Sequence, residues 1–206
     1  MWLGDGCKGC ITTEDEEIIN NCGVLNKSIS LGSNQKTNAK TVRLHGIKIP
    51  LRQLGLFDKL SYDKFVPELY KHNSVSVRLD VLRGLMDTDG TVDKDGSIEF
   101  CVTSKQLCDD IMWLVRPLGG KAILRKSIKK SWYYDKARNR VPCHDAYRVN
   151  IRMPEDMSCF LLSRKKDRLC NTTQERYLSR WIDGIELVGE DDCMCITVAN
   201  NDGLLS

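Results

Sequence analysis

Two stretches of the chain repeat the same order of apolar and polar positions. Each begins with a short apolar segment that ends in Asp-Gly, "WLGDG" at 2–6 and "LRGLMDTDG" at 82–90. In each, an apolar-Thr-Thr or apolar-Thr-Ser sequence leads into an amphipathic helix, predicted over 11–19 and 102–111. The repetition predicts two similar α+β units.

Both amphipathic helices have a recognisable start. Thr13 followed by Glu16 predicts a capping box, and Ser104 is the expected N-cap of the second helix. These caps would place the two helices at equivalent points of the two units.

Strands with alternating polarity follow each helix. The second unit alternates over 121–130 and 146–153, with a long hairpin between the two strands, and the first unit shows a weaker copy at 28–31 and 40–47. A last helix closes each unit. These closing helices are predicted around 64–70 and 159–169, and the whole pattern gives a first half at 1–78, a second half at 79–178 and a C-terminal segment at 179–206.

The helix predicted over 78–90 contains two unfavourable features. Gly84 lies in its interior, where glycine costs about 1 kcal/mol relative to alanine, and Asp87 and Asp89 lie in its last turn, where the helix dipole repels carboxylates. We therefore expect close backbone packing at Gly84, a cation at the acidic end, and Gly90 as a left-handed cap.

Asp5 and Asp89 end the two motifs and lie 84 residues apart. Packing the two motif helices side by side around a pseudo-twofold axis would bring both carboxylates to one end. Oxygen ligands of this kind suit Mg²⁺, which binds through one or two carboxylates, water and phosphate oxygens. Such a site is typical of in-line phosphodiester hydrolysis, whereas a calcium-binding loop in "DTDGTVDKDG" is excluded by its ligand spacing.

Positive charge is concentrated in one part of the chain. The net charge of the whole chain is only +3, but from Lys121 to Arg152 ten lysines and arginines stand against two aspartates, beside the Trp132-Tyr133-Tyr134 cluster. A basic two-stranded face is typical of a β-ribbon that reads a DNA groove, and a solvated outer sheet face is the alternative. The side chains predicted to contact double-stranded DNA are Arg43, Lys121, Arg125, Lys126, Lys129, Lys130, Arg138, Arg140, Arg148, Asn150 and Arg152.

Other classes of protein fit less well. The longest apolar runs are too short for a membrane helix and Met1 opens no signal region, so we expect a cytoplasmic protein with reduced cysteines. Cys7 and Cys10 have zinc-knuckle spacing, but even with Cys22 they do not complete a four-ligand set.

The motifs resemble those of the LAGLIDADG homing endonucleases, in particular the dodecapeptide type found in bacterial and phage inteins. "LRGLMDTDGTVDKDGSIEF" (82–100) is similar to the second motif of that family and "MWLGDG" to the end of its first. "DKFVPELY" (63–70) and "LLSRKKDRL" (161–169) resemble the family blocks that carry a lysine near the active site. The resemblance assigns these lysines to Lys64 and Lys165, with Lys166 as an alternative to the latter.

This resemblance implies a fold, a partner and a reaction. The fold consists of two pseudo-twofold αββαββα halves that form a saddle over duplex DNA, in a monomer. The reaction is Mg²⁺-dependent double-strand cleavage at a long, asymmetric site, with Asp5, Asp89, Lys64 and Lys165 as catalytic residues, in a bacterial or phage-infected cell.

The C-terminal segment 180–206 resembles the start of the returning splicing domain of an intein. Cys195 falls where some inteins carry an aspartate and others a nucleophilic cysteine, but the sequence alone favours a buried strand cysteine over a nucleophile. Because the chain lacks the other splicing blocks, we do not expect it to splice as it stands. Three alternatives remain: a catalytically silent DNA-binding protein on the same fold, an intein fragment that acts mainly in protein splicing, and an RNA-splicing maturase.

Overall fold

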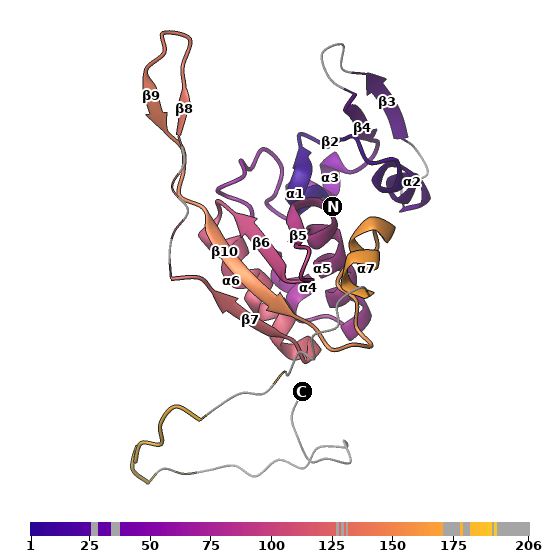
Figure 1. Ribbon diagram of the computed structural model, residues 1–206. Coiled ribbons are helices and arrows are strands. Elements are labelled where there is room, and N and C mark those ends of the chain that lie inside the picture. The colour runs from indigo at the N-terminus through magenta and orange to yellow at the C-terminus, as the bar shows by residue number, and fades with distance from the viewer. Residues whose placement is uncertain are drawn as a thin grey trace.

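The computed structural model describes residues 1–25, 29–33, 38–126, 128, 130, 132–170, 178, 182–190 and 192 (Figure 1). Lys129, residues 34–37 between the two strands predicted in the first half, and most of the C-terminal segment, including Cys195, lie outside these residues. Within them, no helix has the length and apolar character needed to cross a membrane.

The chain forms two halves that share the core order α-β-β-α-β-β-α. The first contains α1 (Trp2–Asp5), β1 (Gly6–Cys7), β2 (Cys10–Thr13), α2 (Glu16–Leu25), β3 (Ile29–Ser33), β4 (Lys40–Leu44), α3 (Lys48–Gln53) and α4 (Glu68–Lys71). The second contains α5 (Val75–Asp89), β5 (Gly90–Val92), β6 (Ile98–Val102), α6 (Lys105–Val115), the 3₁₀ turn η1 (Arg116–Leu118), β7 (Lys121–Leu124), β8 (Trp132–Tyr134), β9 (Arg140–Pro142), β10 (Tyr147–Arg152) and α7 (Ser163–Cys170).

The sheet topologies show the internal symmetry directly. The first sheet has the strand order β1-β2-β4-β3 and the second β5-β6-β10-β7, and every pairing in both is antiparallel. Hairpin β8-β9 is an insertion between β7 and β10 that forms its own two-stranded sheet. The predicted α+β fold of two related halves is confirmed.

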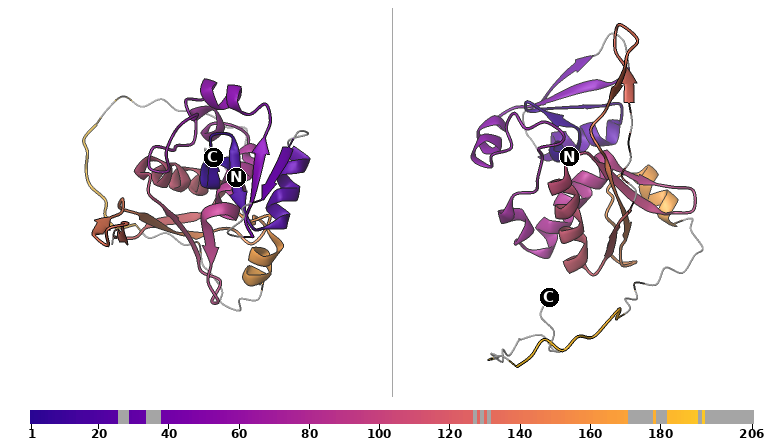
Figure 2. Two further views of the ribbon diagram at one scale, coloured as in Figure 1. Left: turned by 90° about the horizontal axis from the view of Figure 1, so that it is seen from above. Right: turned by 90° about the vertical axis from the view of Figure 1, so that its left-hand side faces the viewer.

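Alternation along the strands decides which face of each sheet is buried. In β10, Val149 and Ile151 are buried while Asn150 and Arg152 are exposed, and helix α6 covers the buried face of this sheet (Figure 2). In the first sheet, Ile11 and Val42 are paired in register and buried. Each half therefore has its own apolar core, and α1 and α5 lie between the two.

Several predicted elements differ from the observed ones. The helices expected over 11–19 and 102–111 begin only at Glu16 and Lys105, because the residues at their predicted starts belong to β2 and β6. The helix expected around 64–70 is only the single turn α4, because Pro67 is its N-cap and residues 64–67 have no regular secondary structure. The helix expected over 159–169 begins at Ser163. The strand expected over 121–130 ends at Leu124, and the helix expected from 78 begins at Val75.

The caps predicted at Gly90 and Thr13 were wrong, whereas the N-cap predicted at Ser104 is confirmed. Gly90 is extended, with φ −78° and ψ 149°, because the chain passes straight from α5 into β5. In α2 the cap is Asp15, whose carboxylate accepts the Glu17 N–H at 3.0 Å, while Thr13 accepts the Asp15 N–H. Ser104 caps α6 by accepting the Leu107 N–H at 3.0 Å.

Candidate active site

Helices α1 and α5 pack with their backbones almost in contact. A Cβ atom added at Gly84 would lie 2.3 Å from the Met1 nitrogen, and one added at Gly4 would lie 1.9 Å from Thr88 Oγ1 and 2.9 Å from Asp89 Oδ2. The absence of side chains at Gly84 and Gly4 therefore permits this approach. The packing explains why α5 tolerates an interior glycine.

The close approach brings the acidic ends of the two helices together. Asp5 ends α1 and Asp89 ends α5. Burial, together with the charge of Asp5, raises the pKa of Asp89 to about 6, and the charges of Lys64 and Lys165 oppose this shift. Burial also raises the pKa of Asp5, against the same two lysines. Both carboxylates are therefore partly desolvated, and the charge of Asp5 acts on the ionisation of Asp89.

Each acidic helix end carries a buried lysine at its carbonyl groups. Lys64 Nζ donates to the carbonyl oxygens of Gly4 and Gly6 at 2.6 and 2.8 Å, and to that of Trp2 at 3.4 Å. Because these carbonyls end α1, the lysine supplies the cation that the dipole of this helix end favours.

Lys165 makes the equivalent contacts on α5. Its Nζ donates to the carbonyl oxygens of Met86, Asp87 and Gly90 at 2.8, 2.7 and 2.6 Å. An ammonium group has three N–H donors, so these carbonyls use all of them. In this arrangement Lys165 acts on its surroundings through its charge, and burial lowers its pKa to about 8.

The side chain of Asp87 lies in a different environment from that of Asp89, and the sequence did not predict this difference. Its side chain is buried, and its carboxylate accepts the backbone N–H groups of Leu161 (3.0 and 3.2 Å) and Leu162 (3.2 Å). This ties the segment before α7 to α5. The two aspartates differ because Asp87 contacts a segment more than 70 residues away in the chain. The local sequence around Asp87 and Asp89 carries no sign of that contact and therefore could not distinguish them.

The pair Asp5 and Asp89 forms the oxygen-rich centre of this region. Among the residues that the structure describes, no group of three or more His, Cys, Asp or Glu side chains is placed to hold a metal ion. Two carboxylates alone fit a hard divalent cation that keeps several positions for water and phosphate oxygens. Burial contributes most to the raised pKa of Asp89, and the charge of Asp5 adds to it. A cation between the two carboxylates would relieve this added repulsion.

Most of the predicted DNA-contacting side chains lie on the open face of the second sheet or on the hairpin. Arg148, Asn150 and Arg152 share one face of β10, and Arg152 is in register with Lys121 on β7. Arg125 Nε is 3.0 Å from Glu99 Oε2 and 3.0 Å from Asn150 Oδ1, so these groups already satisfy one another. Arg43 is exposed on β4 of the first sheet, and Lys126 and Lys130 are exposed between β7 and β8.

Hairpin β8-β9 extends away from both halves (Figure 1). Trp132, Tyr133 and Tyr134 are all at least half exposed. The Arg140 guanidinium lies 3.6 Å from the centroid of the Trp132 ring, and Arg138 is exposed in the turn with φ +63°. Hairpin β8-β9, called the arm below, therefore presents aromatic and cationic side chains to solvent.

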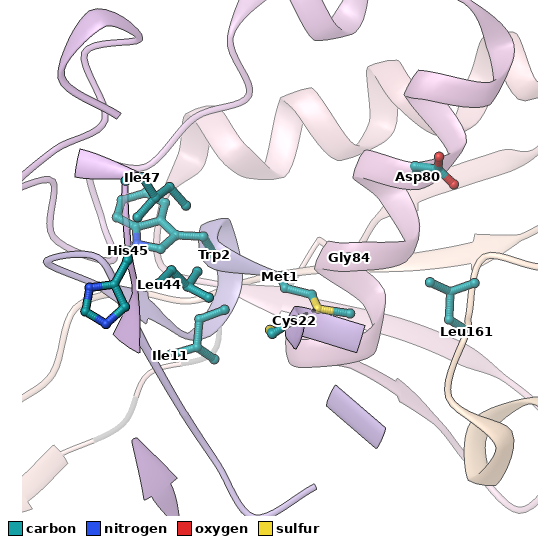
Figure 3. A pocket seen from close by; sticks show the side chains of 11 residues that line it. Met1, Trp2, Ile11, Cys22, Leu44, His45, Ile47, Asp80, Gly84 and Leu161 are labelled. Carbon is teal, nitrogen blue, oxygen red and sulfur yellow. Dashed lines mark hydrogen bonds between the residues drawn. The ribbon is translucent and has the colours of Figure 1, made fainter. Parts of the chain in front are cut away.

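The structure also contains an apolar cavity of about 710 Å³ on the flank of the helix pair (Figure 3). Met1, Ile11 and Leu44 line it, together with Gly84 on α5. Neither acid and neither lysine lines this cavity. Cys22, His45 and Asp80 also line the cavity, but it is separate from Asp5 and Asp89, and we assign no catalytic role to it.

Comparison with known proteins bears on the second half most directly. Residues 76–152 match the family model of the LAGLIDADG-like domain. This range runs from the start of α5 to the end of β10 and contains Asp89 and the basic face of β10.

One curated relative covers nearly the whole chain. The chain is 29% identical over 208 residues to the replicative DNA helicase DnaB of Mycobacterium intracellulare, and the alignment spans 98% of this chain and 31% of the helicase. The chain therefore spans about a third of the length of this relative.

Solved structures of the homing endonuclease I-DmoI show weak similarity. Its complex with DNA and Mn aligns at 15% identity with a TM-score of 0.41, over 69% of this chain and 72% of that one. A structure of its mesophilic variants aligns at 15% identity with a TM-score of 0.43, over 86% and 93%.

Proposed function

We propose that the chain is a divalent-metal-dependent endonuclease that cuts both strands of a specific DNA site, as a LAGLIDADG homing endonuclease does. One observation carries the proposal. Two helices meet at glycines and end in aspartates, and each helix end is held by its own buried lysine. A twofold arrangement of acids and cations suits two phosphodiesters, one on each strand.

Asp5 and Asp89 would hold the metal, with Mg²⁺ as the expected ion. A bound Mg²⁺ would supply a Lewis acid for the phosphate oxygens and a water of lowered pKa as nucleophile. The two carboxylates orient and neutralise this centre. Their partial burial strengthens the attraction for a cation, because water screens the charges less.

Lys64 and Lys165 would keep positive charge beside the acids. Both oppose the rise in the pKa of Asp5 and Asp89, so they favour the ionised carboxylates that a metal ion needs. Their N–H groups bind backbone carbonyls, and we therefore propose an electrostatic contribution together with fixation of both helix ends. Contact with a phosphate would require these hydrogen bonds to rearrange.

The basic face of β10 and the hairpin β8-β9 would bind the duplex. Arginine can pair bidentately with guanine and asparagine with adenine, so Arg148 and Asn150 suit base recognition. Arg138 and Arg140 on the arm suit phosphates, because they lie beyond the sheet at the exposed tip. Internal symmetry makes one copy sufficient, and we propose a monomer.

The similarity to a DnaB helicase over almost the whole chain favours an element inserted into a host gene. We propose an intein context, in which segment 179–206 leads into a splicing domain and Cys195 belongs to it. The uninterrupted coding sequence of a replicative DNA helicase is then the first candidate substrate.

The test uses the purified chain with Mg²⁺ or Mn²⁺ and a DNA library that includes uninterrupted helicase genes, followed by mapping of the new ends. Paired cuts on the two strands at one site would support the proposal. Tight, sequence-selective binding without cuts under any divalent ion would instead favour a catalytically silent DNA-binding protein.

A further inference from the structure

The irregular segment that carries Lys64, residues 64–67, is bound to the second half by hydrogen bonds. The Ser104 hydroxyl donates to the carbonyl oxygen of Lys64 at 2.6 Å, and Ser104 Oγ itself accepts the Leu107 N–H at 3.0 Å. Ser104 is buried and is the N-cap of α6. One side chain thus fixes both the start of α6 and the backbone of the first half's lysine.

A second residue of α6 fastens the same segment two residues further on. Asp110 is buried, and its carboxylate accepts the Val66 N–H at 2.7 Å and a hydrogen bond from Lys71 Nζ at 3.0 Å. Together with Ser104, it holds the chain on both sides of Phe65. Lys64 therefore reaches α1 from a backbone that α6 immobilises.

The reverse contact is made by α2, the equivalent helix of the first half. Its Glu17 carboxylate accepts the Ser163 N–H at 3.0 Å and the Ser163 hydroxyl at 3.1 Å, at the first residue of α7. Its N-cap Asp15 accepts from Arg164 Nε at 2.8 Å. The two residues that precede Lys165 are thus bound to the other half.

We infer that each lysine is positioned by the opposite half, Lys64 by Ser104 and Asp110 and Lys165 by Asp15 and Glu17. This inference rests on the proposed function, and it makes the four side chains positioning residues. The crossed arrangement has a consequence that simple packing lacks. Loss of one contact displaces one lysine and spares the other, so it slows cleavage of one DNA strand more than the other.

The two contacts differ in strength. Ser104 is buried, so its loss leaves the Lys64 carbonyl without that donor in a place that water does not readily reach. The contacts of Glu17 and Asp15 lie at the surface, where water can replace them. The Ser104 variant should therefore show the larger strand bias.

The experiment measures the cleavage rate of each DNA strand separately, on a target labelled at both ends, for Ser104→Ala and Glu17→Ala. We expect the two variants to accumulate nicks on opposite strands. For Ser104→Ala the slowed strand should lose roughly 5- to 100-fold in rate, the factor that corresponds to loss of a buried hydrogen bond. Ser104→Thr, which keeps the hydroxyl, should restore balanced cutting.

Two control variants separate positioning from general loss of stability. Cys108→Ala removes a buried side chain from the same helix and leaves the hydrogen bonds of Ser104 and Asp110 to the Lys64 segment in place, and Glu14→Ala changes an exposed acid beside α2. Both should leave the ratio of the two strand rates unchanged. Equal slowing of both strands by Ser104→Ala and Glu17→Ala would overturn the inference.

A second measurement needs no DNA. The rate of amide hydrogen exchange should rise around residues 64–66 in Ser104→Ala and stay unchanged around 161–166. In Glu17→Ala it should rise around 161–166 and stay unchanged around 64–66. If the wild-type chain cuts no DNA, the proposed function fails while this exchange pattern still decides the positioning. If the exchange rate in either variant rises in both segments or in neither, the inferred positioning of the two lysines is overturned.

Discussion

Lys64 and Lys165 occupy equivalent places in the two halves, each with its ammonium group on the last carbonyls of the helix that ends in an aspartate. Trp2 and Gly6 bind Lys64 at the positions where Met86 and Gly90 bind Lys165. The match follows the same 84-residue offset as the aspartates. The internal symmetry thus extends from the order of strands to single hydrogen bonds.

Replacing Lys165 by methionine should destabilise the protein by about 2–4 kcal/mol, because three carbonyls lose a charged donor in a buried place. Equilibrium urea unfolding measures this change. Lys166→Met, next in the chain and less buried, should stay within about 0.5 kcal/mol of wild type. Equal effects of the two replacements would contradict the assigned role of Lys165.

Replacing Asp89 by asparagine should stabilise the metal-free protein at neutral pH. The pKa of Asp89 is about 6 in the folded chain against an ordinary value of 3.8, because burial and the charge of Asp5 raise it more than the charges of Lys64, Lys165 and the Met1 amino group lower it. The folded state thus binds more protons than the unfolded state between about pH 4 and 6, and stability falls as pH rises through this window.

The expected gain for Asp89→Asn is about 1–3 kcal/mol at pH 7.5 and close to zero at pH 3.5. Thermal unfolding at the two pH values tests it. Added Mg²⁺ should raise the Tm of wild type and leave that of Asp89→Asn unchanged. A variant less stable than wild type at pH 7.5 without metal would contradict the view that Asp89 is a strained carboxylate.

Alanine at Gly84 should disrupt the packing of α1 on α5. Its Cβ would lie 2.3 Å from the Met1 backbone nitrogen, and overpacking of this kind costs about 1–3 kcal/mol or more. Gly23, in α2, offers a matched control, since its added Cβ would meet only Ile29 at 3.5 Å. Gly23→Ala should gain up to about 1 kcal/mol from helix propensity, so urea unfolding should move in opposite directions for the two variants.

The arm and the sheet should contribute differently to DNA binding. Arg138→Ala with Arg140→Ala should weaken binding to all sequences and lower the salt dependence by about one unit per lost phosphate contact. Arg148→Ala should relax preference at one or two base pairs. Binding titrations at several salt concentrations, with specific and random duplexes, measure both effects, and an unchanged salt slope in the double variant would exclude the arm from the interface.

Much of this architecture could be predicted from the chain. Alternation in 146–153 correctly placed Val149 and Ile151 in the core and Asn150 and Arg152 outside. The unfavourable glycine within a helix correctly indicated backbone contact at Gly84. Both features can be recognised in the sequence because they depend on neighbouring residues alone: the alternation of polarity along a strand, and a residue that is unfavourable within a helix.

Other features depend on distant parts of the chain and escaped prediction. A closing helix was expected around Lys64, yet Asp110 and Ser104 bind the backbone of this segment, and it has no regular secondary structure before α4. The different environments of Asp87 and Asp89 likewise come from the segment before α7. A single sequence carries no local signal for such contacts.

Strand-resolved cleavage by Asp5→Asn and Asp89→Asn, each compared with wild type in Mg²⁺, tests the shared acidic centre most directly. Both replacements should lower the cutting of both strands by more than about 100-fold, since even groups behind a metal ligand cost 10- to 100-fold when changed. DNA binding should stay as tight as in wild type or become tighter, because a negative charge facing phosphate is removed. Cleavage near the wild-type rate in either variant would contradict the account.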